Sequence, residues 1–532
     1  MTRPVQGSLT RPGGGSLHPA LHGILEYWWL FAICAWLAAG LLYLTLPPSP
    51  DQFNHAYMGW RLLAGDRLYV DFIDVNWPGV SGLHALATWV FGVHLWSWRA
   101  FDFLMFALSA AFLVDLVRRA ATPMAARICV LTSPLLYVAA GYWMSGQHDM
   151  SAAQFLVIAL WFHVRGDETN RLRWQIGTGL ALGLAMLNKP SVGAMLPLML
   201  LQALLLGKPW VRVVVNGAVV TLAMLATIGT AVLAVLLSGT SLTELIDVTF
   251  VFLFSMQFAD DPAARGQRLL QVLWWTHGRK WADLTLAALP ALVWLLDRRR
   301  RSVATTSLLV LWVTGVLSYA IQGRGLAYHL APSFLALVGF VAVAPTALAG
   351  GRLAVTRPLI HRLALAGLLL FVLLGQAYKF NDLYGKVPRA WLDDDWSHHL
   401  AHFRDLDGIT FKDSVEFAAR AKSESTTDCL LAVSEVSSIN YLSQLRQPTR
   451  FYYFPVIERT RAPMPMAERW LTAWAAELKS SDCRYVLVAR RASEKWQAEP
   501  SPAADSLREL LRGYRESGTL GKNGGLVVYE RN

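Results

Sequence analysis

Charged residues are scarce in this sequence. Asp, Glu, Lys and Arg make up 16% of the 532 residues, 54% are hydrophobic, and the mean hydropathy is +0.36. Soluble domains carry about 25% charged residues, so this composition excludes both a soluble globular chain and a disordered one. Only four cysteines are present, which excludes a small disulfide-rich scaffold. We therefore expect a polytopic membrane protein with one membrane domain and roughly one soluble domain.

Nucleotide-binding signatures are also missing from the sequence. It has neither a Walker A motif nor a GxGxxG motif after a strand. The net charge of +11 does not indicate nucleic-acid binding, because much of it comes from arginines in short loops between apolar runs. We expect no nucleic-acid partner and no nucleotide substrate.

The sequence contains eleven apolar runs that are candidates for membrane-spanning helices. The first is too long for the core of a cleaved signal peptide, so we interpret it as a retained helix. A further run, 78–95, is ambiguous, and we expect it to lie along the membrane surface as one or two interfacial helices. The expected spans are 24–46, 101–117, 126–143, 151–165, 174–188, 191–206, 213–237, 281–296, 303–321, 330–345 and 362–377.

The distribution of basic residues predicts the orientation of these spans. Five loops that would lie on one side hold fifteen Lys and Arg residues, including Arg298–Arg301. The three short loops on the other side hold only Lys189 and Arg324. Because cytoplasmic loops are enriched in basic residues, we expect a cytoplasmic N-terminus and a C-terminus outside, in a bacterial inner membrane.

This topology divides the chain into three parts. Residues 1–23 form a cytoplasmic tail, and residues 24–377 form the transmembrane domain, whose long outer loops are 47–100 and 238–280. We expect the second loop to cover a site as an interfacial lid, or merely to cover the bundle. Residues 378–532 have denser charge and short apolar runs, which predict a small periplasmic α/β domain with a partly parallel sheet.

Two cysteines open two of the predicted strands of this C-terminal domain. Cys429 precedes "LLAV" and Cys483 precedes "YVLVA". If these strands are parallel neighbours, both sulfur atoms lie at the same edge of the sheet, in an oxidising compartment. A disulfide and a pair of buried free thiols are both compatible with this pattern.

The first long outer loop holds the most informative acidic residues. Asp51 follows the first span directly, at the boundary between lipid and water, where partial desolvation tunes a carboxylate to accept a proton near neutral pH. Asp66, Asp71 and Asp74 follow in the same loop. The alternative is that all of them are ordinary solvated acids.

In its motifs this loop resembles the first external loop of the GT-C superfamily of membrane glycosyltransferases, which includes protein O-mannosyltransferases and lipid-A aminoarabinose transferases. Gln52 stands where many relatives carry a Glu, which leaves Asp51 as the one candidate base, and Pro78-Gly79 stands where some carry a Lys before a Pro pair. Later elements follow in the same order and on the same side: "SGQHD" (145–149), "GLAMLNKP" (183–190) and "GRGLAYHLAP" (323–332). The residues of the first loop that carry the resemblance are Asp51, Gly65-Asp66, Tyr69, Asp71-Phe72, Pro78-Gly79, Phe91-Gly92 and Arg99.

Cations held at the outer membrane face predict a phosphate site. Lys189 and Arg324 lie in loops too short to leave the lipid headgroup level, and His148 and His329 lie beside them. Such a ring suits the phosphate of a lipid carrier, although snorkelling beside lipid phosphates would explain the same positions. We expect Lys189, Arg324 and His329 to bind the donor phosphate. We expect Tyr69, Asp71, Asp74, His148 and Asp149 to position donor or acceptor.

The predicted function is inverting transfer of a sugar from a polyprenyl-phosphate donor to an acceptor hydroxyl, with Asp51 as general base. Asp149 and His148 are too few ligands to assign a divalent metal, so we assign no cofactor. The alternative is a flippase, polymerase or transporter for isoprenoid-linked saccharides, which would need charged residues along the middle of its spans. The sequence does not identify the sugar, the polyprenol or the acceptor, which is a glycan, a lipid or a protein.

Overall fold

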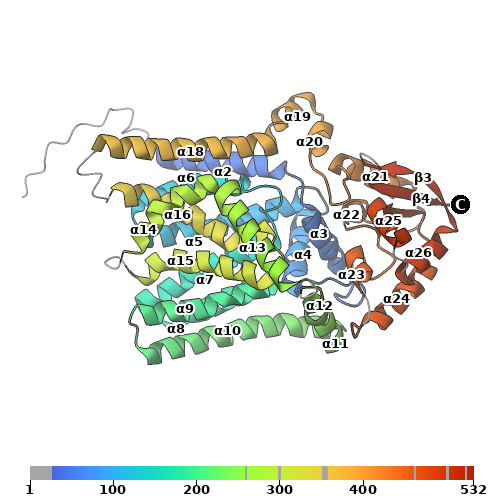
Figure 1. The fold of residues 1–532 in the computed structure, drawn as a ribbon, viewed down its shortest axis with the longest axis horizontal. Coiled ribbons are helices and arrows are strands. Elements are labelled where there is room, and N and C mark those ends of the chain that lie inside the picture. The colour runs from blue at the N-terminus through green and yellow to red at the C-terminus, as the bar shows by residue number, and fades with distance from the viewer. Residues whose placement is uncertain are drawn as a thin grey trace, which may run out of the picture.

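The computed structural model describes residues 27–257, 261–297, 301–349, 358–435, 437–460, 463–498, 502–521 and 524–532. A bundle of long helices makes up one end of the molecule, and a smaller domain of short helices and one sheet makes up the other (Figure 1). The expected fold class, a helical membrane protein with a small C-terminal α/β domain, is confirmed.

Each of the eleven expected apolar runs coincides with a helix of the bundle. Several helices begin at residues that satisfy free backbone groups; Thr122, for example, accepts a hydrogen bond from the amide of Ala125, ahead of Pro123. The bundle helices are α2 (Trp28–Leu44), α5 (Ser97–Ala120), α6 (Pro123–Val138), α7 (His148–Thr169), α8 (Leu172–Asn188), η1 (Pro190–Ala194) with α9 (Met195–Leu205), α10 (Trp210–Leu237), α14 (Ala282–Leu295), α15 (Val303–Gln322), η5 (Ala327–Leu330) with α16 (Ala331–Ala349), and α18 (Pro358–Tyr384).

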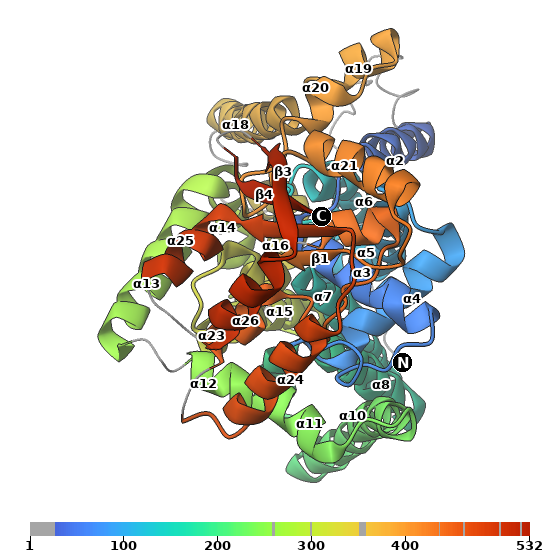
Figure 2. The same ribbon diagram turned by 90° about the vertical axis from the view of Figure 1, so that its right-hand side faces the viewer.

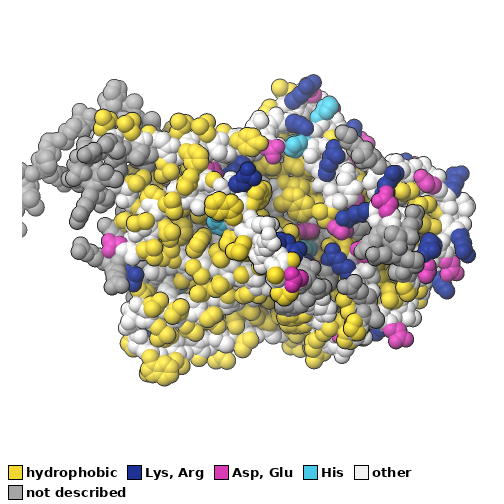
Figure 3. Space-filling view, in the orientation of Figure 1, with side chains coloured by type: hydrophobic (Ala, Val, Ile, Leu, Met, Phe, Trp, Pro, Cys, Tyr) yellow, Lys and Arg dark blue, Asp and Glu magenta, His cyan; other side chains and the backbone are white. Residues whose placement is uncertain are grey.

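Several of these helices are long and apolar enough to cross a membrane. Four of those described meet both criteria: Ser97–Ala120, Trp210–Leu237, Val303–Gln322 and Ala327–Ala349. Shorter apolar helices are Trp28–Leu44, Pro123–Val138, Pro190–Leu205 and Ala282–Leu295. The bundle surface is mostly hydrophobic, whereas charged side chains gather over the C-terminal domain and its junction with the bundle (Figure 3). The protein is therefore a multi-pass membrane protein.

The first long loop is more helical than the sequence indicated. Residues Pro50–Leu63 form α3, where only a loop was expected, and Pro78–Phe91 form α4, as expected. The mixed polar composition of α3 hides its helical pattern, because most of its residues are buried between the bundle and the C-terminal domain. The second long loop contains α11 (Leu242–Ile246), η2 (Asp247–Phe252), α12 (Leu253–Gln257), α13 (Pro262–Trp275) and η3 (Thr276–Lys280).

The C-terminal domain is built on a four-stranded sheet. Its strand order is β1-β2-β4-β3; β1 and β2 are parallel, and the other two pairs are antiparallel. The strands are β1 (Leu431–Val433), β2 (Tyr485–Ala489), β3 (Tyr514–Leu520) and β4 (Leu526–Arg531). The helices are α19 (Val387–Asp393), α20 (Ser397–Leu400), α21 (Phe411–Glu424), α22 (Ser438–Ser443), α23 (Phe454–Arg459), α24 (Ala467–Lys479), α25 (Arg490–Ala498) and α26 (Pro502–Leu511).

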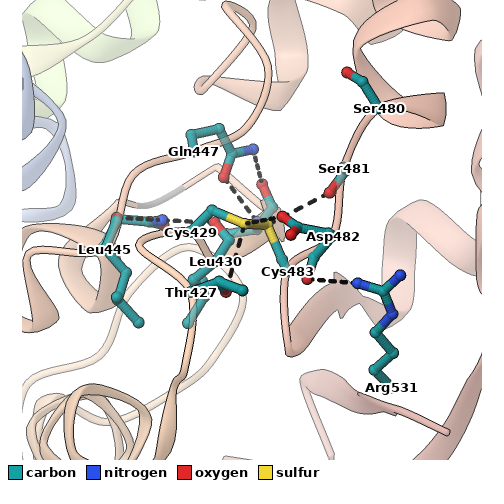
Figure 4. The surroundings of a disulfide bond; sticks show 12 residues. Thr427, Cys429, Leu430, Leu445, Gln447, Ser480, Ser481, Asp482, Cys483 and Arg531 are labelled. Atoms are coloured by element: carbon teal, nitrogen blue, oxygen red, sulfur yellow. Dashed lines mark hydrogen bonds between the residues drawn. A yellow bond between two sulfur atoms is a disulfide. The ribbon is translucent and has the colours of Figure 1, made fainter.

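A disulfide joins the two parallel strands at their amino ends (Figure 4). Cys429 lies just before β1 and Cys483 just before β2, and the bond closes a loop across a sequence separation of 54. Because parallel neighbours start at the same edge of a sheet, the two side chains face each other there.

Hydrogen bonds fix the C-terminal domain on α3. The amide of Asn54 donates to the carbonyl of Glu435 at 2.8 Å, and its side-chain oxygen accepts from the backbone amide of Ser437 at 2.8 Å. The backbone amide of Gln447 donates to the Tyr57 hydroxyl at 2.7 Å. Viewed from the C-terminal end, the sheet and its helices lie over α3 and one end of the bundle (Figure 2).

Candidate active site

A cavity of about 970 Å³ lies where the bundle, α3 and the C-terminal domain meet. Elements that are far apart in the sequence contribute to its wall, including parts of both long loops. The polar and charged residues that line it are Asp51, Asn54, His55, Asp74, Asn76, His148, Asn188, Lys189, Ser191, Thr249, Lys280, Gln322, Arg324, Tyr328, His329, Glu435, Tyr452, Tyr453 and Arg459.

Asp51 occupies the first turn of α3, directly after Pro50. The backbone amide of Ser49 donates to the side chain of Gln52 at 3.1 Å, which closes the start of the helix. The Asp51 carboxylate accepts a hydrogen bond of 3.2 Å from the Tyr328 hydroxyl, which comes from η5. The carboxylate is therefore held at the cavity wall by a helix on one side and a phenol on the other.

The fully buried Arg99 positions the segment that leads into α3. Its guanidinium donates to the carbonyls of Leu46 at 3.2 Å, Pro47 at 2.7 Å and Ser145 at 2.7 Å. These bonds tie the end of α2 to the segment before α7, and so fix where α3 begins. Arg99, one of the motif residues, therefore affects the site by holding these backbone carbonyls in place and does not itself line the cavity.

Lys189 reaches the cavity from the end of α8. Its ammonium lies 3.3 Å from the Asp149 carboxylate and 3.1 Å from the Nε2 atom of His148. Asp149 is 2% exposed and also accepts a hydrogen bond from Gln322 at 3.4 Å. Asp149 therefore lies behind Lys189 and holds it, while Lys189 and His148 form the wall.

The second predicted cation, Arg324, follows α15 and is half-buried in the same wall. It has no carboxylate partner in the part of the chain that the structure describes. The buried His329 lies beside it on η5, with its ring 4.8 Å from that of Tyr328. An unpaired guanidinium in a cavity wall is a ready site for an anion.

A second buried acid, Asp74, lines the cavity from the loop between α3 and α4. It accepts hydrogen bonds from the backbone and side-chain nitrogens of Asn76 and from the Tyr452 hydroxyl at 3.4 Å. Tyr69 supports this loop from behind by donating to the carbonyl of Asn76 at 2.6 Å. The carboxamide of Asn76 also lies 3.3 Å from the His55 ring.

Burial dominates the electrostatics of these side chains. It raises the pKa of Asp51, against the lowering effects of the Tyr328 hydrogen bond and of Lys189. It raises the pKa of Asp74 to about 6, and together with Lys189 it lowers the pKa of His55 to about 3. At neutral pH the cavity therefore offers a base of raised proton affinity beside a neutral imidazole.

The structure brings together most of the residues that the sequence singled out. Asp51, Asp74, His148, Lys189, Arg324 and His329 all line the cavity. Three others do not: Asp149 lies behind Lys189, Tyr69 lies behind its loop, and Asp71 pairs with Arg67 at 2.8 Å on the surface. Asp71 was predicted from its place in the motif, but its side chain lies outside the cavity because the turn at 67–71 closes on itself.

Several cavity residues were missed by sequence reasoning. Tyr328 lies inside the motif "GRGLAYHLAP", but the sequence predicted a role only for its neighbours Arg324 and His329. Glu435, Tyr452, Tyr453 and Arg459 come from the C-terminal domain, more than 380 residues after Asp51 in the sequence. Only the aromatic run "RFYYF" (450–454) marks this part of the cavity wall in the sequence.

Among the described residues, no group of three or more His, Cys, Asp and Glu side chains is arranged to hold a metal ion.

Comparison with known proteins gives one family match and several structural matches. The family model of the dolichyl-phosphate-mannose-protein mannosyltransferases matches residues 78–237. No curated protein matches the sequence. ArnT from Cupriavidus metallidurans in the apo state superposes with a TM-score of 0.58 at 14% identity, covering 96% of this chain and 98% of that one. The same protein bound to undecaprenyl phosphate gives 0.57 at 13%, covering 95% and 98%.

The chain has the GT-C fold. The Archaeoglobus fulgidus oligosaccharyltransferase in complex with zinc and sulfate also matches, with a TM-score of 0.51 at 14% identity, covering 93% of this chain and 73% of that one. The expected resemblance to GT-C glycosyltransferases is thus confirmed at the level of the fold. Because the ArnT match spans nearly all of both chains, it includes the C-terminal domain as well as the bundle of this GT-C protein.

Proposed function

We propose that this protein is a membrane glycosyltransferase that moves a sugar from a polyprenyl-phosphate donor to an acceptor hydroxyl, with inversion at the anomeric carbon. One observation carries the proposal: a carboxylate of raised proton affinity, Asp51, lines the same cavity as the cations Lys189 and Arg324. A base and a phosphate site in one cavity are what direct transfer from a sugar phosphate requires.

Each charged group has a defined task in this reaction. Asp51 takes the proton of the acceptor hydroxyl as its oxygen bonds to the anomeric carbon. The bond from that carbon to the phosphate oxygen breaks, and polyprenyl phosphate leaves with the electron pair. Lys189 and Arg324 stabilise the negative charge that gathers on the leaving phosphate, and the buried His329 completes this wall. His148 and Asp74 position donor and acceptor.

The fold comparisons support the same substrate class. ArnT from Cupriavidus metallidurans was crystallised with undecaprenyl phosphate, and a structure of the archaeal oligosaccharyltransferase carries a tethered acceptor peptide. We infer that this chain also takes a polyprenyl-phosphate lipid as donor.

We further propose that the cavity faces outward from a bacterial inner membrane. The C-terminal domain at the cavity contains the Cys429–Cys483 disulfide, and disulfides persist in oxidising compartments. Three of the basic loops come together, since Arg119 pairs with Glu168 and both Lys208 and Arg212 pair with Asp167. Loops enriched in basic residues are typical of a cytoplasmic side.

The test is donor turnover by purified protein reconstituted with a panel of polyprenyl-phosphate sugars, read as release of polyprenyl phosphate. Replacing Asp51→Asn keeps the shape of the side chain but removes the base. We expect turnover to fall by roughly 10²- to 10⁴-fold, the usual contribution of general base catalysis.

A matched control is Asp393→Asn, an identical change at an exposed acid on α19. Turnover equal to wild type in both variants would contradict the role of Asp51. Absence of turnover with every donor, in wild type as well, would contradict the enzymatic proposal and favour transport of the lipid-linked saccharide.

A further inference from the structure

Helix α13 carries an exposed apolar face to which the proposed reaction assigns nothing. Leu270 is 69% exposed and Trp274 is 74% exposed. Leu269, Val272 and Leu273 lie on the other face and pack against the hydrophobic core. In the view from the C-terminal end the helix projects from the flank of the molecule (Figure 2). Exposed leucine and tryptophan side chains gathered on one face of a helix indicate a binding surface.

The position of α13 in the chain indicates that this face meets the lipid bilayer. The helix ends at Trp275, and α14, one of the apolar bundle helices, begins seven residues later, after the short helix η3. Seven residues reach at most about 25 Å, so the end of α13 lies near the start of α14. On α14 the side chains of Leu289 and Val293 are exposed as well. Tryptophan and leucine on such a helix favour the boundary between lipid and water.

The other face of α13 lies on the segment that carries Arg324. Gly323 and Gly325 flank this arginine, and both have positive φ, 67° and 68°. A methyl group added to Gly323 would lie 3.1 Å from the Cδ atom of Arg265, and one added to Gly325 would lie 3.0 Å from the Cγ atom of Arg268. Both of these arginines belong to α13. The two glycines therefore let the helix approach the backbone on either side of Arg324.

A hydrogen bond fixes the same contact. The Tyr319 hydroxyl donates to the carbonyl of Leu269, on α13, at 2.8 Å. Tyr319 lies in the last turn of α15, and its own carbonyl accepts from the amide of Gly323 at 3.3 Å, where that helix ends. Tyr319 thus connects α13 to the helix end that Arg324 follows. A displacement of α13 would therefore move the Arg324 guanidinium in the cavity wall.

We propose that the outward face of α13 binds the outer surface of the lipid bilayer, at the level of the headgroups, and that this contact positions Arg324 for the phosphate of the lipid donor. This inference rests on the proposed glycosyl transfer and adds to it a positioning role for α13. Leu270 and Trp274 lie among the lipids and hold the helix against the two glycines. Arg324 is then presented at the depth of a lipid phosphate, because α13 and the donor headgroup meet the same bilayer surface.

The first measurement is the depth of α13 in nanodiscs of phosphatidylethanolamine and phosphatidylglycerol that hold the full-length protein. A nitroxide is attached at Trp274→Cys in a Cys34→Ser background, which leaves the disulfide and the buried Cys129 in place. Its accessibility to oxygen and to a water-soluble nickel chelate is compared with that at Leu222→Cys on α10 and at Ser517→Cys on β3, both exposed positions. We expect the label on α13 to be more accessible to oxygen than the label on β3, and more accessible to the chelate than the label on α10.

Two results of this measurement would overturn the proposal. Accessibility on α13 equal to that on β3 would place the helix in water. Low accessibility to both reagents would show that a protein surface, such as a second copy of this chain, covers the helix. The measurement needs no turnover, so it judges the membrane contact even where the glycosyl transfer fails its own test.

The second measurement is a double-mutant cycle on the binding of tritiated undecaprenyl phosphate to the protein in the same nanodiscs, read by scintillation proximity against empty nanodiscs. We expect Trp274→Gln to weaken binding roughly three- to tenfold, a coupling usual for residues that act through each other. In an Arg324→Gln background the same change should weaken binding by less than about twofold. Trp210→Gln, at an exposed tryptophan of α10, is the matched control and should leave binding unchanged.

Equal losses in the two backgrounds would show that α13 does not act through Arg324, and so would an affinity that Trp274→Gln leaves unchanged. Either result would overturn the positioning role. Binding that follows the expected pattern, with no turnover of any donor, would refute the glycosyl transfer and leave the phosphate site and its dependence on α13 in place.

Discussion

The contact between Asp51 and Tyr328 joins two segments that are 277 residues apart. The phenol donates to the carboxylate, so it stabilises the charged form, while burial favours the neutral form. The proton affinity of the base is thus set by two opposing effects, and one of them depends on a single hydroxyl group.

Replacing Tyr328→Phe removes only that hydroxyl. Without it, the pKa of Asp51 rises further, because the effect that lowered it is gone. A general base works only when deprotonated, so activity rises with pH through its pKa, and the acid limb of kcat/KM moves to higher pH in the variant. The measurement is a pH profile of donor turnover, with Tyr529→Phe as a control. An unmoved acid limb would show that this limb does not report Asp51.

The charged residues of the site could largely be predicted from the sequence. Charged side chains close to the membrane are energetically costly, so the few that occur there are candidates for a functional site. Asp51, Lys189 and Arg324 stood out for that reason. Tyr328 did not, since a tyrosine at a membrane boundary usually reads as an interfacial anchor. Asp71, by contrast, is a motif position whose side chain turns outward to Arg67.

At the scale of elements, α3 sets the position of Asp51, and it packs closely against α4. Gly59 lies against the backbone of His84 and Ala85, where an added methyl group would overlap backbone atoms. Gly82, on α4, has open space around it. The two glycines therefore form a matched pair on neighbouring helices.

Replacing Gly59→Ala pushes α3 away from α4. Overpacking costs about 1–3 kcal/mol, offset in part by a gain of roughly 1 kcal/mol in helix propensity. We expect kcat/KM to fall by roughly ten- to a hundredfold, because Asp51 moves with the helix. Gly82→Ala should leave turnover near wild type and gain up to about 1 kcal/mol of stability, because only the helix-propensity term applies there. Thermal unfolding and donor turnover check both variants, and equal behaviour of the two would contradict the close packing.

The helices of the bundle could be placed from apolar run length alone, whereas α3 could not. Its sequence "PDQFNHAYMGWRLL" carries polar residues such as Gln52, Asn54 and His55 at buried positions, because it is surrounded by protein on several sides. The parallel pairing of β1 with β2 was predictable as a possibility. β4 pairs antiparallel with β2 and forms a hairpin with β3. This hairpin was not predicted from the sequence.

At the scale of the whole molecule, the C-terminal domain completes the site. Glu435, Tyr452 and Tyr453 line the cavity, and Asn54 on α3 binds the backbone on both sides of residue 436. Such contacts between distant segments lie beyond what local sequence patterns predict.

Replacing Asn54→Leu keeps the volume but leaves a buried carbonyl and a backbone amide without their partner. Each costs about 1–3 kcal/mol. We expect faster hydrogen exchange in α22, which follows Ser437, and reduced donor turnover. The control is Asn381→Leu at an exposed position of α18. Unchanged exchange in α22 would show that other contacts suffice to fix the domain.

The dependence of the cavity on residues after 430 has a consequence for biosynthesis. Asp51 is synthesised before the tyrosines that line the cavity with it, so a nascent bundle carries its charged groups uncovered until the last hundred or so residues have been made. Chains that stop early would retain every membrane helix and yet have no enclosed site. The closed cavity therefore forms only after the C-terminal domain has been synthesised and has folded onto α3.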